Sequence, residues 1–270
     1  MAKLFYDTPE IREDEVLVFK SSAKKKEVTT QIEKNYDALT TAEIKQRYKL
    51  VEQAIRKELA SFIEHKTWER VLKSKCQNIC SSRWVLRWKE IDGVRSIKAR
   101  LTIRGFEDTA DVTSYASTAS RWSQRLVVRI AVQHGWQLWV SDISTAFLRG
   151  MTFQELSELT QSEIRDVAFT PPKGWEKYFT ELPGMSQYNF STEALKLLKA
   201  VYGLRDAPRA WRIRLDRELR KLGGQALPTD KSLYCFYDAH KRLEAIISAH
   251  VDDLKGTGES NRVKQIIKGC

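Results

Sequence analysis

The sequence predicts an α+β protein in which antiparallel strand pairs and amphipathic helices share one chain. The first observation is Asp92-Gly93, which lies between two segments of alternating apolar and polar residues and is typical of a hairpin turn. The second is a set of apolar residues at helical spacing within residues 40–65. The third is the apolar stretch 245–253, which ends in two adjacent carboxylates. Two glycines follow soon after, as expected for a strand and a chain reversal.

The overall composition favours an anionic partner. The 270 residues suffice for one large domain or two small ones, and Lys plus Arg number 46 against 35 acidic residues, a net charge of +11. Eight Trp, nine Tyr and ten Phe supply flat rings that can stack on bases as well as fill a core. Nucleic acid suits both features, although a basic surface also suits a membrane or a ribosomal partner.

The cysteines and the N-terminus indicate an intracellular protein. Cys76 and Cys80 lie close together without a second pair at metal-ligand spacing, and Cys235 and Cys270 stand alone. Reduced thiols explain them better than a zinc site, which needs four ligands. We find neither a secretory signal peptide nor an apolar run long enough to span a membrane, so no membrane partner is expected.

The chain is predicted to divide into a lead and one folded domain. Residues 1–39 are read as a charged, loosely ordered lead or linker, and residues 40–270 as the domain. The domain opens with a capping box made by Thr40 and Glu43. A single amphipathic helix is expected from there to about residue 65, with an apolar face formed by Ile44, Tyr48, Val51, Ile55, Leu59 and Phe62.

The next element is the hairpin over residues 83–104. Two tryptophans, Trp84 and Trp88, alternate with basic side chains along its strands. The basic residues are Arg83, Arg87, Lys89, Lys98, Arg100 and Arg104. Such a hairpin can lie along the phosphates of a nucleic acid, or it can form the solvated outer face of a sheet. The pattern alone does not separate these two interpretations.

A helix and a strand follow the hairpin. Ser120 is suited to cap a helix that ends at Gly135, with one face formed by Leu126, Val127, Ile130 and Ala131. A strand is then expected over residues 136–142, and it ends on Asp142.

The second half of the chain contains one loop-rich segment and one clear helix. Residues 151–190 mix proline and glycine with short apolar pieces and are read as a loop-rich insertion rather than a separate domain. A helix begins near Asp206, a natural N-cap, with Pro208 in its first turn. Its apolar face is formed by Trp211, Leu215, Leu219 and Leu222.

The carboxylates at the strand ends gain meaning as a set. Taken alone, Asp252-Asp253 is better explained by an acidic turn. Asp142 ends another strand, however, and acids from two adjacent strand ends can bridge two cations roughly 3.5–4 Å apart. Such a pair orients an attacking hydroxyl and neutralises a leaving diphosphate.

Side-chain alternation indicates which way these acids face. Ser248, His250 and Asp252 share one side of their strand, which favours a cleft on that side. Asp142 is in phase with Leu138 and Val140, so it must lie at the open end of its strand or bear a heavy burial cost.

Four motifs together resemble a known family. Ser141-Asp-Ile-Ser-Thr-Ala-Phe-Leu-Arg-Gly150 resembles the first palm motif of reverse transcriptases of copia-type LTR retrotransposons, and Lys98-Ala-Arg-Leu-Thr-Ile-Arg-Gly-Phe106 resembles their fingers motif. Leu198-Lys-Ala-Val-Tyr-Gly-Leu-Arg-Asp-Ala-Pro-Arg-Ala-Trp211 resembles the block before the last palm helix, and His250-Val-Asp-Asp253 the tyrosine-x-Asp-Asp box. The motifs occur in the family's order over residues 40–258. The resemblance makes an acidic turn, or an unrelated two-metal nuclease, a minor alternative.

The resemblance implies a right-hand polymerase with fingers and an antiparallel palm sheet backed by helices. Such an enzyme extends a primer 3′-hydroxyl on an RNA or DNA template with deoxynucleoside triphosphates (dNTPs). Asp142, Asp252 and Asp253 would be the catalytic acids and would bind two Mg2+ ions, for which Mn2+ is an alternative. The backbone carbonyl of Ile143 would add a further ligand.

The same resemblance implies roles around the incoming nucleotide. Phe147 would crowd a ribose 2′-hydroxyl, the alternative being a core phenylalanine. Lys98 and Arg100, with Arg104 as a weaker candidate, would contact the triphosphate through charge-assisted hydrogen bonds.

The sequence also departs from the family's pattern. His250 stands where a tyrosine is usual, and Asp206 where the family commonly has glutamine. The sequence ends before a thumb or ribonuclease H, so we expect a Pol fragment that associates with other Pol segments. The alternative is a catalytically inactive retrotransposon remnant that only binds nucleic acid.

Overall fold

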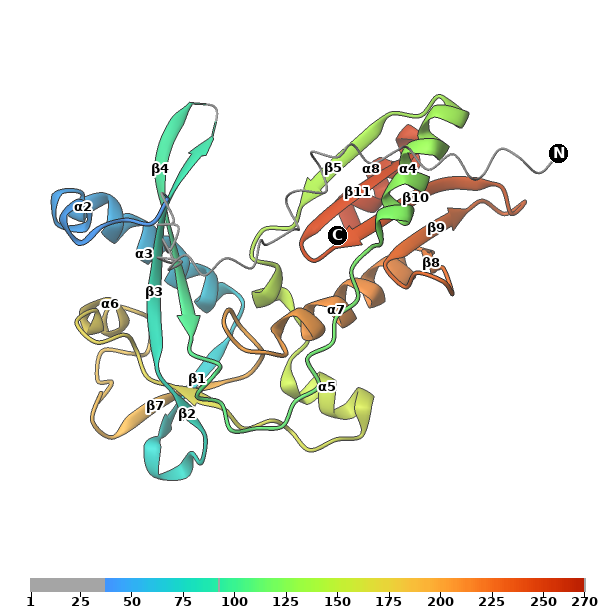
Figure 1. Cartoon of the computed structure of the whole chain (residues 1–270). Helices are drawn as coiled ribbons and strands as arrows, with labels where there is room; N and C mark the ends of the chain where they lie inside the picture. Colours follow the sequence, from blue (N-terminus) through green and yellow to red (C-terminus); the bar gives the residue numbers. More distant parts are fainter. Residues whose placement is uncertain (1–36, 92, 270) are drawn as a thin grey trace, which may run out of the picture. The chain divides into compact units, whose positions relative to one another are not determined.

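A computed structural model of the chain describes residues 37–91 and 93–269. Helices and strands alternate irregularly along it, as the α+β prediction requires (Figure 1). The α-helices are α2 (Thr41–Gln46), α3 (Tyr48–Glu64), α4 (Arg121–His134), α5 (Phe153–Thr160), α6 (Glu176–Thr180), α7 (Ala207–Lys221) and α8 (Ser260–Gly269). Two short 3-10 helices are η1 (Lys73–Lys75) and η2 (Ala146–Arg149).

The strands form three sheets. One has four strands in the order β1-β7-β6-β2, one has five in the order β5-β11-β10-β9-β8, and β3 pairs with β4 alone. All pairs are antiparallel except β2 with β6. The strands are β1 (Trp68–Leu72), β2 (Ile79–Cys80), β3 (Ser82–Ile91), β4 (Val94–Ile103), β5 (Leu138–Asp142), β6 (Ala168–Phe169), β7 (Glu193–Leu197), β8 (Gln225–Ala226), β9 (Leu233–Tyr237), β10 (Leu243–His250) and β11 (Asp253–Gly258).

The predicted helix over residues 40–65 is two helices. The Thr40–Glu43 capping box is present, but Arg47 has φ −106° and ψ 25°, which ends α2 before α3 begins. The two helices have different anchors. Trp88 of β3 donates a hydrogen bond to the Glu43 carboxylate at 3.0 Å, whereas α3 buries its apolar face in the core. The apolar periodicity of the sequence continues across Arg47, so the periodicity could not reveal the break between the two helices.

The hairpin prediction is confirmed. β3 and β4 pair in register from Ser82 opposite Ile103 to Ile91 opposite Val94. Gly93 has φ +74°, as a two-residue hairpin turn requires of this position, while Asp92 lies outside the described residues. Most of the predicted lead, residues 1–36, also lies outside them. Its last residues are paired to the hairpin, since Trp88 N donates to the Asp37 carbonyl at 2.6 Å.

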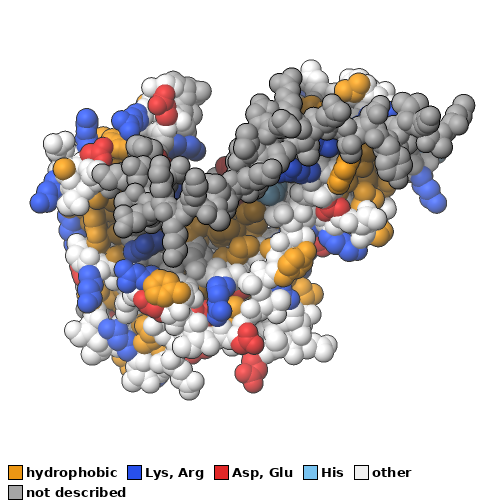
Figure 2. Space-filling model, viewed as in Figure 1, with side chains coloured by type: hydrophobic (Ala, Val, Ile, Leu, Met, Phe, Trp, Pro, Cys, Tyr) orange, Lys and Arg blue, Asp and Glu red, His pale blue; other side chains and the backbone are white. Residues whose placement is uncertain are grey.

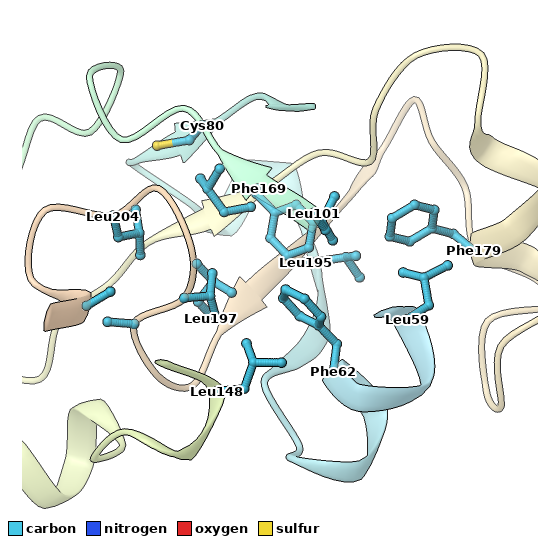
Figure 3. Packing of buried hydrophobic residues seen from close by; sticks show 14 of the residues in the cluster. Leu59, Phe62, Cys80, Leu101, Leu148, Phe169, Phe179, Leu195, Leu197 and Leu204 are labelled. Atoms are coloured by element: carbon cyan, nitrogen blue, oxygen red, sulfur yellow. The ribbon is translucent and has the colours of Figure 1, made fainter. Parts of the chain in front are cut away.

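One hydrophobic core joins α3 to the four-stranded sheet and the hairpin (Figure 3). The side chains that α3 contributes to this core recur every three or four residues and therefore lie on one side of the helix. They are Val51, Ile55, Leu59 and Phe62. Segment 151–190 also enters this core through α5, β6 and α6. Those contributions include Phe153, Val167, Phe169, Tyr178, Phe179, Met185 and Tyr188.

Helices cover both faces of the five-stranded sheet. On one face, α7 and α8 pack through Trp211, Leu215, Leu219 and Ile266 against alternate residues of β10. On the other face, Val127 of α4 packs against Ile246 and Cys235. The caps predicted for α4 are present: Ser120 accepts from Ser123 N, and Gly135 is left-handed. The predicted face of α4 is rotated, because Leu126 is 39% exposed while Ser123 is buried.

No helix among the described residues is both long enough and apolar enough to cross a membrane. Cys76, Cys80 and Cys235 are free cysteines among these residues.

Candidate functional site

Three carboxylates meet at one end of the five-stranded sheet. Asp142 is the last residue of β5, and it lies directly opposite Asp253, the first residue of β11. Asp252 precedes Asp253 in the turn from β10. One carboxylate oxygen from each of the three lies within 4.8 Å of the others. Segments more than 100 residues apart in the sequence thus combine into one acidic cluster.

The turn that carries Asp252 is tight and held from two sides. β10 ends at His250, which pairs with Asp253, so only Val251 and Asp252 make the reversal. Val251 has φ +57°, a costly conformation for a β-branched residue and one that tends to occur at functional sites. The Trp211 indole donates to the Val251 carbonyl at 2.7 Å, and Ile143 N donates to the Asp252 carbonyl at 2.9 Å.

The sequence prediction misplaced this reversal. It put the chain reversal after the aspartates, at Gly256 and Gly258, but both glycines lie inside β11. Gly256 is there for packing: a Cβ would come within 2.5 Å of the Trp139 ring on β5. The missing side chain therefore lets β5 and β11 pair closely behind the acids.

The structure also settles the orientation of Asp142. Leu138 and Val140, which share its phase, are 54% and 68% exposed. That side of β5 is therefore open and Asp142 itself is exposed, so the carboxylate bears no burial cost. Of the two outcomes that the sequence left open for Asp142, the structure bears out the first, a place at the open end of its strand. The apolar residues in phase with Asp142 mark the exposed face of β5.

The acidic cluster has a donor set suited to a hard divalent cation. Its three groups offer only carboxylate oxygens, the ligand type that Mg2+ prefers. Within residues 37–91 and 93–269, no Lys or Arg forms an ion pair with any of the three. No ion pair within the described residues therefore neutralises the clustered negative charge.

A cavity of about 490 Å³ lies between the hairpin and the segment that follows Asp142. Lys98 and Arg100 of β4 line it together with Phe147 of η2. The Lys98 side chain is exposed, yet desolvation of its ammonium group and, next, the charge of Arg100 lower the pKa of Lys98. The negative charge of Asp142 acts on that pKa in the opposite direction, which links this cavity electrostatically to the acids.

Tyr202 is a further wall of this cavity that sequence reasoning did not single out. The Arg100 guanidinium lies over its ring at 4.6 Å, and the Phe147 ring centroid is 5.4 Å away. Burial, and then the charge of Glu58, raise the pKa of Tyr202 to about 12, so its hydroxyl stays protonated. The sequence feature that could have pointed to this wall is the dipeptide Tyr202-Gly203. A Cβ on Gly203 would come within 1.9 Å of the Ile103 carbonyl, so this glycine lets the chain press against β4.

The remaining predicted residues have mixed placements. Phe147 lines the cavity and also packs against both main cores, as the core interpretation expects, and its role against a ribose 2′-hydroxyl stays a prediction. Arg104 is not among the cavity's lining residues. Its side chain donates to the Ser81 hydroxyl at 3.1 Å and lies 3.9 Å from Glu107. Ile143 has a buried side chain, and its carbonyl as a metal ligand stays a prediction.

Asp206 does not act as the predicted side-chain cap. It occupies the N-cap position of α7 without a capping hydrogen bond, because its carboxylate pairs with Arg165. Arg165 also pairs with Asp108, whose side chain is fully buried. The charge of Asp206 is therefore held by a partner. His250, the second residue that departs from the motif pattern described above, is exposed at the end of β10 beside the acids.

Known proteins resemble this chain over most of its length. Residues 65–269 match the family model described as "Reverse transcriptase (RNA-dependent DNA polymerase)". The Retrovirus-related Pol polyprotein from transposon RE2 of Arabidopsis thaliana is 28% identical over 213 residues, 76% of this chain and 13% of the relative. The corresponding polyprotein from transposon RE1 of the same plant is 27% identical over 212 residues, with the same coverage of 76% and 13%.

A third relative, the Retrovirus-related Pol polyprotein from transposon TNT 1-94 of Nicotiana tabacum, is 24% identical over 80% of this chain and 15% of its own length. The chain thus spans only 13–15% of these relatives. The family match includes the three clustered acids and most of the cavity lining. The chain belongs to the reverse transcriptase (RNA-dependent DNA polymerase) family, in the form found in copia-type retrotransposon Pol polyproteins.

Proposed function

We propose that residues 40–270 are the fingers and palm of a reverse transcriptase that extends a primer 3′-hydroxyl with dNTPs by two-metal nucleotidyl transfer. The observation that carries the proposal is the cluster of Asp142, Asp252 and Asp253 within 4.8 Å. In this assignment the five-stranded sheet is the palm and the β3–β4 hairpin belongs to the fingers.

The metal ligands would be the three carboxylates and the Ile143 carbonyl. Two bound Mg2+ ions would supply Lewis-acid stabilisation of the attacking and leaving oxygens. The strained Val251 turn fixes Asp252, and the Asp142–Asp253 strand pair fixes the other two acids. Preorganisation of this kind matters because phosphoryl transfer depends mostly on positioning and electrostatics.

The cavity would receive the incoming nucleotide. Lys98 and Arg100 would donate charge-assisted hydrogen bonds to its triphosphate. Phe147 and Tyr202 would form the apolar wall against the sugar, with Phe147 excluding a ribose 2′-hydroxyl. Arg104 is a weaker candidate, because Ser81 and Glu107 already engage it.

The proposed partners are an RNA or DNA template-primer and other segments of a Pol polyprotein. The net charge of +11 supports an anionic partner. Because the chain spans 13–15% of its relatives, association with further Pol segments fits a polyprotein origin.

Primer extension tests the proposal directly. We expect the full chain to extend oligo(dT) on poly(rA) with Mg2+, and Asp252→Asn to reduce the rate by a factor on the order of 10² or more, because a metal ligand that stabilises the transition state contributes several kcal/mol. Asp111→Asn is the matched control, since Asp111 is exposed and lies outside the acidic cluster. Extension that survives Asp252→Asn would contradict the site assignment.

The second candidate function is a remnant that binds nucleic acid without catalysis. The observation that favours it is the exposed His250, which stands beside the acids where the family has tyrosine. Salt-sensitive template-primer binding without any extension by the unaltered chain would support it. Extension restored by His250→Tyr would then locate the defect at the primer end.

A further inference from the structure

A second, smaller cavity lies behind the acidic cluster. Its volume is about 290 Å³, at the lower end of the range for ligand pockets. It is formed where the end of α3, η2, the segment after β7 and the middle of α7 meet. The lining residues are His65, Arg149, Lys199, Trp211, Arg214, Leu215 and Glu218.

The charges around this cavity do not balance. Arg214 is paired with Glu155 at 2.7 Å and lies 3.7 Å from Glu218. Arg149 and Lys199 have no ion-pair partner among the residues that the structure describes. Two cationic side chains outside any ion pair therefore face one small space, beside the Glu218 carboxylate, which Arg214 and Lys221 engage.

The electrostatics of Lys199 support the same conclusion. Its side chain is half-buried, and this burial, together with the charge of Arg214, lowers the pKa of Lys199. The cationic form of Lys199 is thus disfavoured, and a bound anion would oppose that effect. Desolvation lowers the pKa of His65, so the cationic donors of this cavity are Arg149 and Lys199 rather than a protonated His65.

We propose that this cavity binds a phosphate-type oxyanion. A guanidinium and an ammonium group are the usual donors for such an anion, and they converge here from η2 and from the chain after β7. The space suits a phosphate or diphosphate group rather than a whole nucleotide. The anion is either free phosphate or diphosphate, or one phosphate of a nucleic-acid backbone. The proposal does not depend on polymerase activity.

The cavity adjoins both segments that carry the clustered acids. His65 Nε2 lies 3.1 Å from the Thr145 hydroxyl, three residues after Asp142. Thr145 has φ +56°, so the chain turns sharply at this contact. Trp211 also lines the cavity and donates its indole N–H to the Val251 carbonyl beside Asp252. An anion in the cavity would therefore lie against two supports of the catalytic acids.

Calorimetric titration of sodium diphosphate into the full chain without divalent metal tests the proposal. Because Lys98 and Arg100 are a second candidate site for diphosphate, Lys98→Met/Arg100→Gln serves as the background. On it we expect saturable binding that Arg149→Gln/Lys199→Met weakens at least about tenfold. Lys57→Met/Arg129→Gln removes the same charges from exposed helix positions and is expected to change binding by less than about twofold.

A second arm identifies the source of the anion. The same variants are titrated with a short single-stranded oligonucleotide at constant ionic strength. If Arg149→Gln/Lys199→Met weakens oligonucleotide binding beyond the control, the cavity takes a backbone phosphate; if it weakens only diphosphate binding, the cavity takes the free anion.

Two results would overturn the proposal. One is the absence of saturable binding of both diphosphate and the oligonucleotide by the Lys98→Met/Arg100→Gln background, which decides the matter even if the cavity variant fails to fold. The other is unchanged binding of both probes by an Arg149→Gln/Lys199→Met variant with a native circular dichroism spectrum.

Discussion

Glu58 places a carboxyl group against the free edge of β4. Its Oε1 accepts a hydrogen bond from Leu101 N at 3.3 Å, a group that the hairpin partner cannot reach. Burial raises the pKa of Glu58 to about 7, while the Leu101 hydrogen bond and the charge of Arg100 oppose the shift. The folded state therefore holds a proton more tightly than the unfolded state, in which the ordinary value of 4.5 applies.

This pKa predicts how stability depends on pH. Between about pH 4.5 and about pH 7 the folded state binds more protons, so the free energy of unfolding falls as pH rises through that window. We expect Glu58→Gln to be more stable than the unaltered chain at about pH 8 by roughly 1–3 kcal/mol, because one pKa unit corresponds to about 1.4 kcal/mol. At about pH 4.5 the difference should vanish.

Urea unfolding at both pH values measures this difference. The glutamine amide oxygen can still accept from Leu101 N, so the hydrogen bond is retained, whereas Glu58→Ala removes the acceptor and should be destabilising at either pH. A glutamine variant with the pH dependence of the unaltered chain would show that Glu58 does not titrate as described.

Tyr202 joins Arg100 and Phe147 into one wall of the larger cavity. If the cavity receives the nucleotide, Tyr202→Ala should raise the KM for dNTPs roughly tenfold, since a cation–π and an aromatic contact together contribute about 1–2 kcal/mol. Tyr202→Phe keeps the ring and should change KM little. Steady-state primer extension measures both.

The exposed Tyr115 supplies the matched control, and Tyr115→Ala should leave the KM for dNTPs unchanged. An unaltered KM in Tyr202→Ala would place the nucleotide elsewhere, whereas loss of all extension in every variant would point to the proposed function itself.

At the scale of elements, a buried ion network ties three distant segments together. Arg165, from the loop-rich segment, pairs with Asp108 after the hairpin and with Asp206 at the start of α7. Asn78 donates to Asp108 at 2.8 Å. All three charged side chains are at most 10% exposed, so each depends on the others for compensation.

Removal of the central cation should be severe. Arg165→Met leaves two buried carboxylates without a counter-charge, and we expect the free energy of unfolding to fall by about 3–5 kcal/mol. The triple variant Asp108→Asn/Arg165→Met/Asp206→Asn leaves no buried charge and should lose less. Arg129→Met, on the exposed side of α4, is the control for loss of an arginine. Urea unfolding measures the free energy of unfolding of each variant. An Arg165→Met variant as stable as Arg129→Met would show that the network does not contribute to stability.

At the scale of the whole molecule, two arginines hold the segment that runs from the hairpin to the five-stranded sheet: Arg205, just before α7, and Arg212, within it. Arg205 donates to the Ala110 carbonyl at 2.6 Å, and Arg212 to the Ser117 hydroxyl at 3.2 Å. The crossing segment then joins the sheet, where Ala119 N donates to the Ala249 carbonyl at 3.1 Å. Part of the protein's positive charge therefore makes hydrogen bonds within the fold.

The remaining positive charge is dispersed. On the visible described surface, Lys and Arg side chains stand at many separate places among hydrophobic ones (Figure 2). A nucleic acid bound to such a surface meets several cations at once. We expect the affinity for a template-primer duplex to fall at least about tenfold from about 50 to about 200 mM salt, because bound cations release counterions from the phosphates.

Fluorescence anisotropy with a labelled duplex measures this salt dependence. Lys98→Met/Arg100→Gln should reduce its slope if the hairpin contacts phosphates, whereas the matched Lys57→Met/Arg129→Gln should not. An affinity independent of salt would argue against a phosphate interface altogether.

Local features of this protein could be predicted from the sequence because neighbouring residues decide them. Asp92-Gly93 predicted the hairpin, and the Thr40 and Ser120 caps were predicted correctly, since each depends on a few adjacent residues. The helix break at Arg47 was missed, because the contact of Glu43 with Trp88 joins residues far apart.

The sequence by itself determined the hairpin, the helix caps and, through four ordered motifs, the family. Only the tertiary structure decided how the residues of those motifs meet. In the folded chain the reversal lies at Val251 rather than at Gly256, and Asp142 is exposed. Asp206 forms an ion pair with Arg165, and Tyr202 lines the cavity. The physical reason is the same in each case: these outcomes depend on cross-strand register, close packing against glycine and buried charge pairing, which join residues that the sequence keeps far apart.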